Sequence, residues 1–346
     1  MRRAFITGTA GFIGFHLAKL LIDKGWQVHG YDGMTEYYDI RIKKRRHAIL
    51  RAHDSFQATE AMLEDAVTLD QAISHASPDV IVHLAAQAGV RYSIDNPRAY
   101  VEANIVGTFN LMEAALRTRP QHLLMASTSS VYGANTEMPY AETQKADTQM
   151  SFYAATKKAN EAMGHAWAHI HDLPITMFRF FTVYGPWGRP DMALFKFTKA
   201  ILAEQPIDVY NHGQMWRDFT YVDDLVRAIL LLIDAVPGGG ETAVTGDSLS
   251  PVAPFRTVNI GNSDKVRLED FIDAIEQATG QTATRNYLDM QPGDVPATWA
   301  DASLLRALTG YTPKTDIQEG VARFVEWYRN EWPAIDTTPG LDEAQS

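Results

Sequence analysis

The sequence predicts an α/β protein in which helices cover both faces of a doubly wound parallel sheet, with a smaller α/β domain after it. Short apolar runs alternate with amphipathic stretches through the first half of the 346 residues, a pattern typical of parallel sheets. The second half is more irregular and richer in turns. With 46% hydrophobic and 21% charged residues, the chain can bury one large core or two smaller ones.

Five apolar runs are predicted to be strands of the large sheet. The stretches between them are long enough to cross over a sheet face as helices. Because right-handed crossovers bring the carboxyl ends of parallel strands together, we expect a crevice along that edge. The predicted strands are 4–7, 28–31, 80–84, 122–127 and 175–181, and the predicted helices are 12–24, 66–76, 98–117 and 153–171.

The second half predicts a less regular architecture. It contains a turn-rich segment at 182–193, helices near 194–204, 222–235 and 317–330, and a glycine-rich loop at 237–254. The last helix is expected to end at Trp332-Pro333, before a frayed polar tail. We expect the large domain to comprise 1–181 with about 217–258, the smaller domain about 182–216 and 259–330, and the tail 331–346.

Composition excludes several classes of function. A formal net charge of −11 disfavours nucleic acid and anionic membranes, since phosphate binding needs clustered Lys and Arg. Without cysteine there is no disulfide, thiolate nucleophile or Cys-ligated metal, which fits the cytoplasm. Three glycines, His16 and Lys19 interrupt the N-terminal apolar run, so we expect a strand entering a helix and no signal peptide. No 18 uncharged apolar residues occur in a row, so no membrane span is expected.

A glycine motif stands at the first strand-to-helix junction. Gly8, Gly11 and Gly14 form GxxGxxG between the strand 4–7 and the helix 12–24. Main-chain amides and a helix N-terminus can face a pyrophosphate there, and glycine permits the close approach. The alternative is a tight turn without a ligand.

An acidic residue supports a dinucleotide at this turn. Asp32 lies 18 residues past Gly14 at the end of the second strand run, where a carboxylate can accept a hydrogen bond from a ribose diol. Its alternative role is to cap the following turn. Gly33 and Met34 come next, so no basic residue there meets a 2′-phosphate. The two features together predict a Rossmann-type site for NAD in preference to NADP.

A tyrosine and a lysine form the strongest candidate for catalysis. Tyr153 and Lys157 are spaced i, i+4, which places both on one helix face. A nearby ammonium favours tyrosinate and would lower the Tyr153 pKa toward that of a useful general base. The hydroxyl run 127–130 follows the strand 122–127 and could hydrogen-bond an alcohol. The alternatives are a surface pair and a Ser/Thr-rich turn.

These motifs occur in the order found in a known family. GxxGxxG, a hydroxyl run before Val131-Tyr132-Gly133, and YxxxK together resemble the extended short-chain dehydrogenases/reductases that act on sugar nucleotides. Longer segments, over roughly residues 1–330, are similar to UDP-glucuronate 4-epimerases. They are AAQAGVRYS (85–93), FFTVYGPWGRPDMALF (180–195), DVYNHG (208–213), RDFTYVDD (217–224), NIGN (259–262) and MQPGDVPATWAD (290–301).

The resemblance implies NAD-dependent epimerisation of UDP-glucuronate to UDP-galacturonate at C4 through a transient 4-keto sugar. It gives Thr128, Tyr153 and Lys157 the catalytic positions. Relatives usually place an Asp against the adenine where Met62 stands, so NAD affinity could be weaker. The remaining cofactor positions are Phe12, Ile13, Leu63, Leu84, Ala85, Ala86, Gln87, Asn104 and Phe181.

Two serines distinguish the possible reactions. Related decarboxylases carry Glu just before the VYG triplet and related 4,6-dehydratases carry Asp-Glu, whereas Ser129 and Ser130 stand here. A 4-keto uronate is a β-keto acid and loses carbon dioxide readily unless its carboxylate is held still. We expect Ser129, Ser130 and Arg189 to hold it. Alternatively, Arg189 caps its turn or pairs with Asp191.

The resemblance also implies residues for the rest of the substrate. Arg217 would bind the diphosphate, Val209 and Tyr210 would border the uracil, and Thr182 joins the substrate-binding residues. Arg91 could reach phosphate or carboxylate, or form a structural salt bridge, and the two readings are equally supported. The histidines show no metal-binding spacing, so no metal is expected.

Three alternatives to this function remain. The same scaffold could carry a UDP-glucuronate decarboxylase or dehydratase, or another UDP-sugar 4-epimerase. A non-catalytic NAD-sensing module is also conceivable, but the intact Thr128, Tyr153 and Lys157 argue against it. A homodimer is expected from the family resemblance, and the helices 98–117 and 153–171 could form its four-helix interface.

Overall fold

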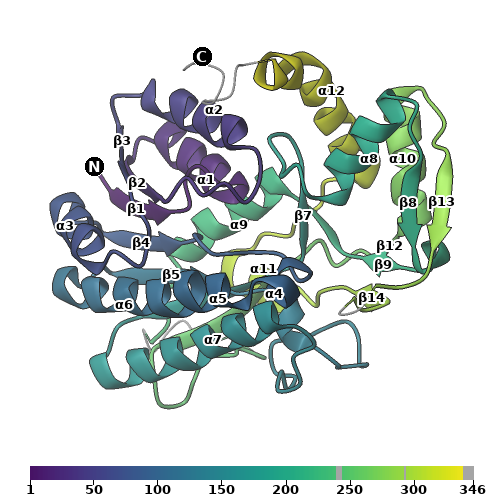
Figure 1. Ribbon diagram of the computed structural model, residues 1–346. Helices are drawn as coiled ribbons and strands as arrows, with labels where there is room; N and C mark the ends of the chain where they lie inside the picture. The colour runs from purple at the N-terminus through teal and green to yellow at the C-terminus, as the bar shows by residue number, and fades with distance from the viewer. Residues whose placement is uncertain (239–243, 292–293, 338–346) are drawn as a thin grey trace.

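The computed structural model describes residues 1–238, 244–291 and 294–337, and a seven-stranded sheet lies at its centre (Figure 1). Every paired strand in this sheet is parallel to its neighbour, and the spatial order is β11-β6-β5-β4-β1-β2-β3. The predicted doubly wound parallel sheet is therefore confirmed. Its strands are β1 (Arg3–Thr7), β2 (Gln27–Asp32), β3 (Phe56–Glu60), β4 (Val80–His83), β5 (His122–Ala126), β6 (Ile175–Phe180) and β11 (Phe255–Ile260).

Helices cover both faces of the sheet, so its central strands are apolar on both sides. In β1, Ala4 and Ile6 face one core while Phe5 faces the other. The first face is covered by α1 (Phe12–Asp23), α2 (Ile40–Arg51), α9 (Val222–Ile233) and α11 (Ser303–Thr309). The second face is covered by α3 (Ala66–Ala76), α6 (Gly107–Thr118) and α7 (Phe152–His171).

A second, aromatic-rich core lies beside the large sheet, on the right of Figure 1. At its centre the rings of Phe219 and Phe271 stack with centroids 4.2 Å apart. Its helices are α8 (Ala193–Leu202), α10 (Leu268–Thr279) and α12 (Ile317–Asp336). Its short strands are β7 (Thr182–Tyr184), β8 (Ile207–Tyr210), β9 (Trp216–Arg217), β10 (Phe219–Tyr221), β12 (Val266–Arg267), β13 (Arg285–Leu288) and β14 (Ala297–Thr298).

The boundaries of several elements differ from those expected. The helix expected at 98–117 consists of α5 (Pro97–Tyr100), a π-helical turn at Val101–Val106, and α6. The boundary expected near 258 falls inside β11, and the division into two domains stays a prediction. Short turns of helix also occur at α4 (Tyr92–Asp95), Ser129–Tyr132 and Asn211–Gly213.

The last helix is longer than expected. It continues through Pro333 to Asp336, because Trp332 and Ile335 are buried in the second core. Residues 338–346 of the expected tail, and 239–243 of the expected glycine-rich loop, lie outside the described residues. None of the described helices is long and apolar enough to cross a membrane.

Candidate active site

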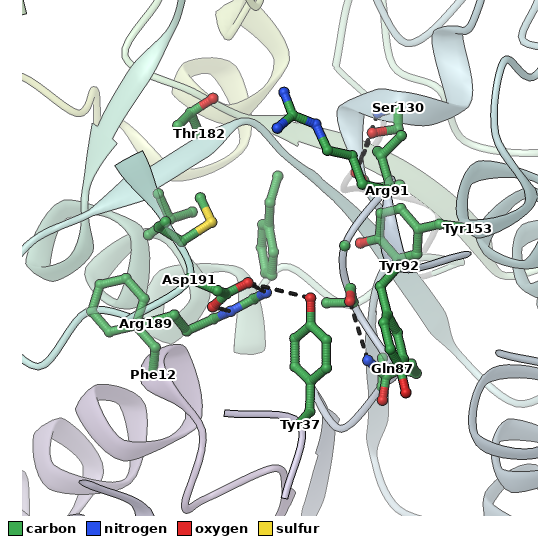
Figure 2. Close-up of a pocket in the computed structure, with 18 of the residues that line it drawn as sticks. Phe12, Tyr37, Gln87, Arg91, Tyr92, Ser130, Tyr153, Thr182, Arg189 and Asp191 are labelled. Carbon is green, nitrogen blue, oxygen red and sulfur yellow. Dashed lines mark hydrogen bonds and ion pairs between the residues drawn. The ribbon is translucent and has the colours of Figure 1, made fainter. Parts of the chain in front are cut away.

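One cavity of about 1120 Å³ brings together the residues predicted to bind cofactor and substrate. Its wall begins at the glycine turn after β1 and ends at β8 and β9 beside the second core. Figure 2 shows side chains from both ends directed into this space. Of all the predicted site residues, Asn104 and Val209 are the two that do not line it.

The glycine turn allows main chain to form the cavity wall. Gly8 has φ +81°, and a Cβ there would lie 2.8 Å from the amide nitrogen of Ala85. A Cβ on Gly14 would lie 2.0 Å from the carbonyl oxygen of Gly8. Gly11 precedes the first residue of α1, so the amides at the start of this helix are available to an anion.

Asp32 caps the turn that follows it, which was its alternative role, and it also lines the cavity. Its Oδ2 accepts from the Ala10 amide at 2.9 Å, and its Oδ1 accepts from the Met34 amide at 2.9 Å. A carboxylate has about four lone-pair positions, so both oxygens can still accept from a ribose.

Asn104 acts behind the cavity wall. It is fully buried in the π-helical turn, and its Oδ1 accepts from the Gln87 amide at 2.8 Å. Its Nδ2 donates to the Gln87 carbonyl at 3.0 Å and to Thr156 at 3.1 Å. Asn104 therefore fixes the main chain of Gln87, which lines the cavity itself.

Tyr153 and Lys157 both face the cavity from the start of α7. Lys157 is buried, donates from Nζ to the Ala126 carbonyl at 3.0 Å, and has its pKa lowered to about 8 by burial. Burial raises the pKa of Tyr153, while the Thr128 hydroxyl and the Arg189 charge act in the opposite direction. The lowered Tyr153 pKa expected from the sequence is wrong here, because desolvation outweighs both neighbours and the ammonium points to main chain.

The hydroxyl groups of the run 127–130 differ in their hydrogen-bond partners. Ser127 donates to buried Glu161 at 2.7 Å, and Glu161 pairs with Arg179 at 2.8 Å, so Ser127 is committed to the core. Thr128 accepts from the Ser130 amide at 3.2 Å and starts the short helical turn that follows β5. All four residues of the run, 127–130, line the cavity.

Arg189 and Asp191 form an ion pair in the cavity wall (Figure 2). Nε of Arg189 donates to Oδ1 of Asp191 at 3.0 Å, and Nη2 donates to Oδ2. Tyr37 donates to the same Oδ2 at 3.3 Å. The structure thus contains the pairing considered as the alternative, and it also places Arg189 where a ligand can reach it.

Arg91, Tyr210 and Arg217 line the far end of the cavity. Arg91 donates to Asp294 at 2.9 Å, and its guanidinium lies 4.7 Å from the centre of the Tyr210 ring. Arg217 donates to the Trp216 carbonyl at 2.9 Å, and burial lowers its pKa. Arg91 therefore has the salt bridge that was one of its two expected roles.

The cavity wall is much less acidic than the whole chain. Its described side chains include equal numbers of cations and carboxylates, whereas the chain has a formal net charge of −11. The cations are Lys43, Arg91, Lys157, Arg189, Lys196 and Arg217, and the carboxylates are Asp32, Glu64, Glu102, Asp191, Asp208 and Asp294. Within the described ranges, no group of three or more His, Asp or Glu could hold a metal ion.

Known proteins resemble the chain over almost its full length. The family model described as GDP-mannose 4,6 dehydratase matches residues 5–324. A probable UDP-glucuronate 4-epimerase of Rhizobium meliloti (strain 1021) is 56% identical, covering 97% of this chain and 99% of the relative. The chain belongs to the UDP-glucuronate 4-epimerase family. Its motifs place this family among the extended short-chain dehydrogenases/reductases.

One further relative and one solved structure are also similar to the chain. UDP-glucuronate 4-epimerase 1 of Arabidopsis thaliana is 42% identical, with 93% of this chain and 76% of that protein covered. The crystal structure of a UDP-glucuronic acid 4-epimerase from Bacillus cereus, in complex with UDP-glucuronic acid and NAD, has a TM-score of 0.85. It is 30% identical, and the match covers 95% of this chain and 99% of that one.

Val209 was expected from the UDP-glucuronate 4-epimerase motif to border the uracil, but it does not line the cavity. Its side chain is fully buried in the second core, while Asp208 and Tyr210 line the cavity. Neighbouring side chains of β8 point to opposite faces, so at most two of these three can face a ligand.

Sequence reasoning on this family member missed Tyr37, Lys43 and Asp191 as cavity residues. Lys43 is buried, donates to Thr35 Oγ1 at 2.9 Å and has its pKa lowered to about 8, mainly by burial. These residues lie outside the family motifs except Asp191, which had been considered only as a partner of Arg189. The cluster of aromatic and basic residues after Asp32 was the available signal.

Met62, where the resemblance leads us to expect an Asp, lies against the turn after β2. A Cβ on Gly33 would lie 2.4 Å from its sulfur, so Met62 packs over Gly33. Met62 and Leu63 both line the cavity. This part of the wall is therefore apolar where the resemblance predicted a carboxylate.

Proposed function

We propose that the chain is an NAD-dependent 4-epimerase that interconverts UDP-glucuronate and UDP-galacturonate. One observation carries the proposal: a single cavity is lined by the glycine turn, by Tyr153 and Lys157, and by Ser129, Ser130 and Arg189. No carboxylic acid stands at positions 129 and 130 to protonate a reacting carbon. Membership of the UDP-glucuronate 4-epimerase family supports the same reaction.

The residues at the glycine turn fit NAD. A Cβ on Gly8 or Gly14 would collide with main chain, so only glycine allows this close turn; α1 offers its first amides, and Asp32 offers a carboxylate to a ribose. When bound, NAD supplies an acceptor and donor of hydride for C4 of the sugar. The segment 84–87, whose last residue Gln87 is held by Asn104, and Phe181 complete the wall on this side.

Tyr153 is the proposed general base. It takes the proton of the C4 hydroxyl and returns it after the ketone has turned over, while Thr128 hydrogen-bonds the same oxygen. Because burial keeps the Tyr153 pKa high, proton removal depends on positive charge nearby. Arg189 provides it, since its charge lowers the Tyr153 pKa, and Lys157 lines the same cavity.

The opposite end is proposed to hold the uronate and the nucleotide. Ser129, Ser130, Thr182 and Arg189 would bind the C6 carboxylate, whose immobilisation protects the β-keto acid from losing carbon dioxide. Arg217 would bind the diphosphate. Tyr210 would stack on the uracil, with Arg91 at the same end.

The proposal is tested by incubating purified protein with UDP-glucuronate, with and without added NAD, and resolving products by chromatography and NMR. UDP-galacturonate is the expected product. A UDP-pentose would assign the chain as a decarboxylase, and conversion of UDP-glucose alone would assign another UDP-sugar 4-epimerase. Tyr153→Phe is the matched control and should abolish conversion while leaving nucleotide-sugar binding intact.

Two copies are proposed to associate through α6 and α7 as a homodimer. Exposed apolar side chains lie along these helices and the turn before them, and the Phe109 and Trp167 rings meet edge to face at 5.9 Å across the pair. They are Val101, Val106, Phe109, Phe152 and Ile170. Sedimentation should give twice the 38.6 kDa chain mass, and Phe109→Glu should give one chain. A dimeric Phe109→Glu would refute this interface.

The cytoplasm is the proposed location, supported by the absence of cysteine from the sequence. Fractionation of cells expressing the tagged protein should recover it with cytoplasmic markers. Recovery with secreted or envelope proteins would refute the proposal.

A further inference from the structure

The carboxylate of Asp191 accepts hydrogen bonds along one edge of the Arg189 guanidinium. Nε and Nη2 of Arg189 both donate to its carboxylate, the first at 3.0 Å. A guanidinium has five N–H donors, so this pairing occupies two and leaves the edge formed by Nη1 and Nη2. The Arg189 charge lowers the pKa of Tyr153, so the guanidinium lies within electrostatic reach of the proposed base.

Tyr37 ties this pair to the cofactor side of the molecule. Its hydroxyl donates to Oδ2 of Asp191 at 3.3 Å, and its ring lies 5.6 Å from the Arg189 guanidinium. Tyr37 is itself held, because a Cβ on Gly89 would lie 2.6 Å from its hydroxyl and the Tyr92 ring packs on it at 4.9 Å. The loop after β2 thus fixes a carboxylate that comes from the loop after β7.

We infer that Asp191 and Tyr37 are positioning residues that fix the direction from which Arg189 binds the substrate carboxylate. The inference deepens the proposed function and rests on it. An unpaired arginine has several rotatable bonds and can follow a moving carboxylate. A guanidinium held along one edge presents its other edge in one direction, and a carboxylate can accept two parallel hydrogen bonds there.

The direction matters because of the chemistry of the 4-keto sugar. If the C5–C6 bond aligns with the ketone, that bond breaks, carbon dioxide leaves, and its electron pair stays on C5 as an enolate. C5 then takes up a proton, while the two electrons already removed from C4 remain with the cofactor. The product is a UDP-4-keto-pentose. A fixed Arg189 should hold the carboxylate away from this alignment.

Charge alone predicts the opposite effect. Asp191 is a second anion near the substrate carboxylate, so removing its charge should tighten uronate binding if electrostatic repulsion were its main effect. Positioning predicts weaker uronate preference and more carbon dioxide loss. The two readings therefore differ in sign, which makes the inference testable with Asp191→Asn.

The variants are Asp191→Asn, Asp191→Glu and Tyr37→Phe, with Asp70→Asn as the matched control, since Asp70 forms an Asp–Arg pair with Arg117 outside the cavity. Products are quantified by NMR. Affinities for UDP-glucuronate and UDP-glucose are measured by calorimetry in a Tyr153→Phe background, where no turnover interferes. Affinity for UDP-glucose and the thermal unfolding curve report whether each variant is folded.

For Asp191→Asn we expect the pentose fraction to rise about tenfold or more, and the preference for UDP-glucuronate over UDP-glucose to fall about tenfold. Tyr37→Phe keeps all charges and should show about a threefold change in the same direction, because only one of the contacts is lost. Asp191→Glu should fall between wild type and Asp191→Asn. Asp70→Asn should behave as wild type.

Tighter binding of UDP-glucuronate by Asp191→Asn, without more pentose, would overturn the inference and make Asp191 a competitor of the substrate. Unchanged product ratio and preference in both Asp191→Asn and Tyr37→Phe would overturn it as well. If wild type formed no UDP-galacturonate, the proposed function would fail, but the binding preferences would still decide whether Asp191 positions Arg189. The two failures are therefore separable.

Discussion

The two ends of the cavity differ in the chemical groups that form their walls. At the glycine turn the wall is main chain, packed so closely that a Cβ on Gly14 would lie 2.0 Å from a carbonyl oxygen. At the other end, Arg91 and Arg189 each pair with an aspartate and lie near an aromatic ring. One end is fixed by sterics and the other by pairs of opposite charge.

This difference teaches what kind of change each end tolerates. A main-chain wall has no side chain to adjust, so a single added methyl group there conflicts with the backbone. A wall of paired charges can lose one partner without a backbone collision, and its attraction for anions depends on ionic strength. We therefore expect steep effects at the glycine turn and graded effects at the arginines.

The largest effect should occur where the two ends meet. Tyr153→Phe removes the proposed proton acceptor, and loss of a general base costs about 10²–10⁴-fold in rate. We expect kcat for UDP-galacturonate formation to fall about 10³-fold, with affinities for NAD and UDP-glucuronate nearly unchanged in calorimetry. A rate within tenfold of wild type would show that another group takes the proton.

The next largest effect tests the main-chain end. Gly14→Ala should weaken NAD binding at least about 100-fold, because the new methyl group and the Gly8 carbonyl cannot both keep their places. Gly280→Ala is the matched control: it has φ +69° but no atom within 4 Å of its Cβ. It should cost about 1 kcal/mol of unfolding free energy and leave NAD binding unchanged. Calorimetry that finds normal NAD affinity in Gly14→Ala would break the comparison.

Acid should weaken the large sheet before the second core. Burial lowers the pKa of His122 in β5 to about 4 and that of His83 in β4 to about 3. The unfolded chain takes up these protons near pH 6.5 and the folded chain does not, so their contribution to stability is complete above pH 6.5 and is lost progressively as pH falls from 6.5 to the folded values.

Asp218 beside the second core has the opposite sign. Its pKa is raised to about 6, mainly by burial, so its contribution to stability grows as pH falls.

The histidine effect is measured with His122→Gln. Between pH 7 and 5, the unfolding free energy of the wild type should fall by about 2 kcal/mol more than that of His122→Gln in denaturant titrations. Hydrogen exchange at pH 5 that shows the second core opening before β4 and β5 would contradict this order.

The smallest effect tests the charged end. Arg217→Met keeps the apolar stem and should raise KM for UDP-glucuronate about tenfold, with kcat little changed. Wild-type KM should rise with salt, and the variant should respond less, because one screened contact has been removed. Arg306→Met, at an exposed position outside the cavity, is the control. Equal salt responses in wild type and Arg217→Met would remove Arg217 from the diphosphate site.

The sequence predicted the central strands and the glycine turn well because local physics determines them. The apolar runs that form β1, β4, β5 and β6 are buried on both faces, so their composition alone reveals them. β3, β11, α2 and α10 were missed. β3 is an edge strand with the mixed sequence FQATE, and α2 is rich in Lys and Arg, so neither shows a clear apolar pattern.

The candidate site was predictable where residues are neighbours in sequence, as in Tyr153 and Lys157. Contacts between distant loops were not. No spacing rule joins Tyr37 to Asp191 or Arg91 to Asp294, because tertiary packing alone brings those loops together. The same reason explains the Tyr153 pKa: the sequence shows a lysine four residues away but not the burial that opposes it.

The path of the chain between the two cores limits how such proteins can be recombined. After β6 the chain enters the second core through β7, β8 and β9, returns in α9 and β11, leaves again through β12, α10 and β13, and comes back in α11 before ending in α12. Exchanging the nucleotide-sugar end between relatives by one crossover would therefore mix strands of both parents inside the large sheet. A working chimera needs a crossover at every point where the chain passes between the two cores. A single recombination event therefore cannot exchange one end of the cavity without the other.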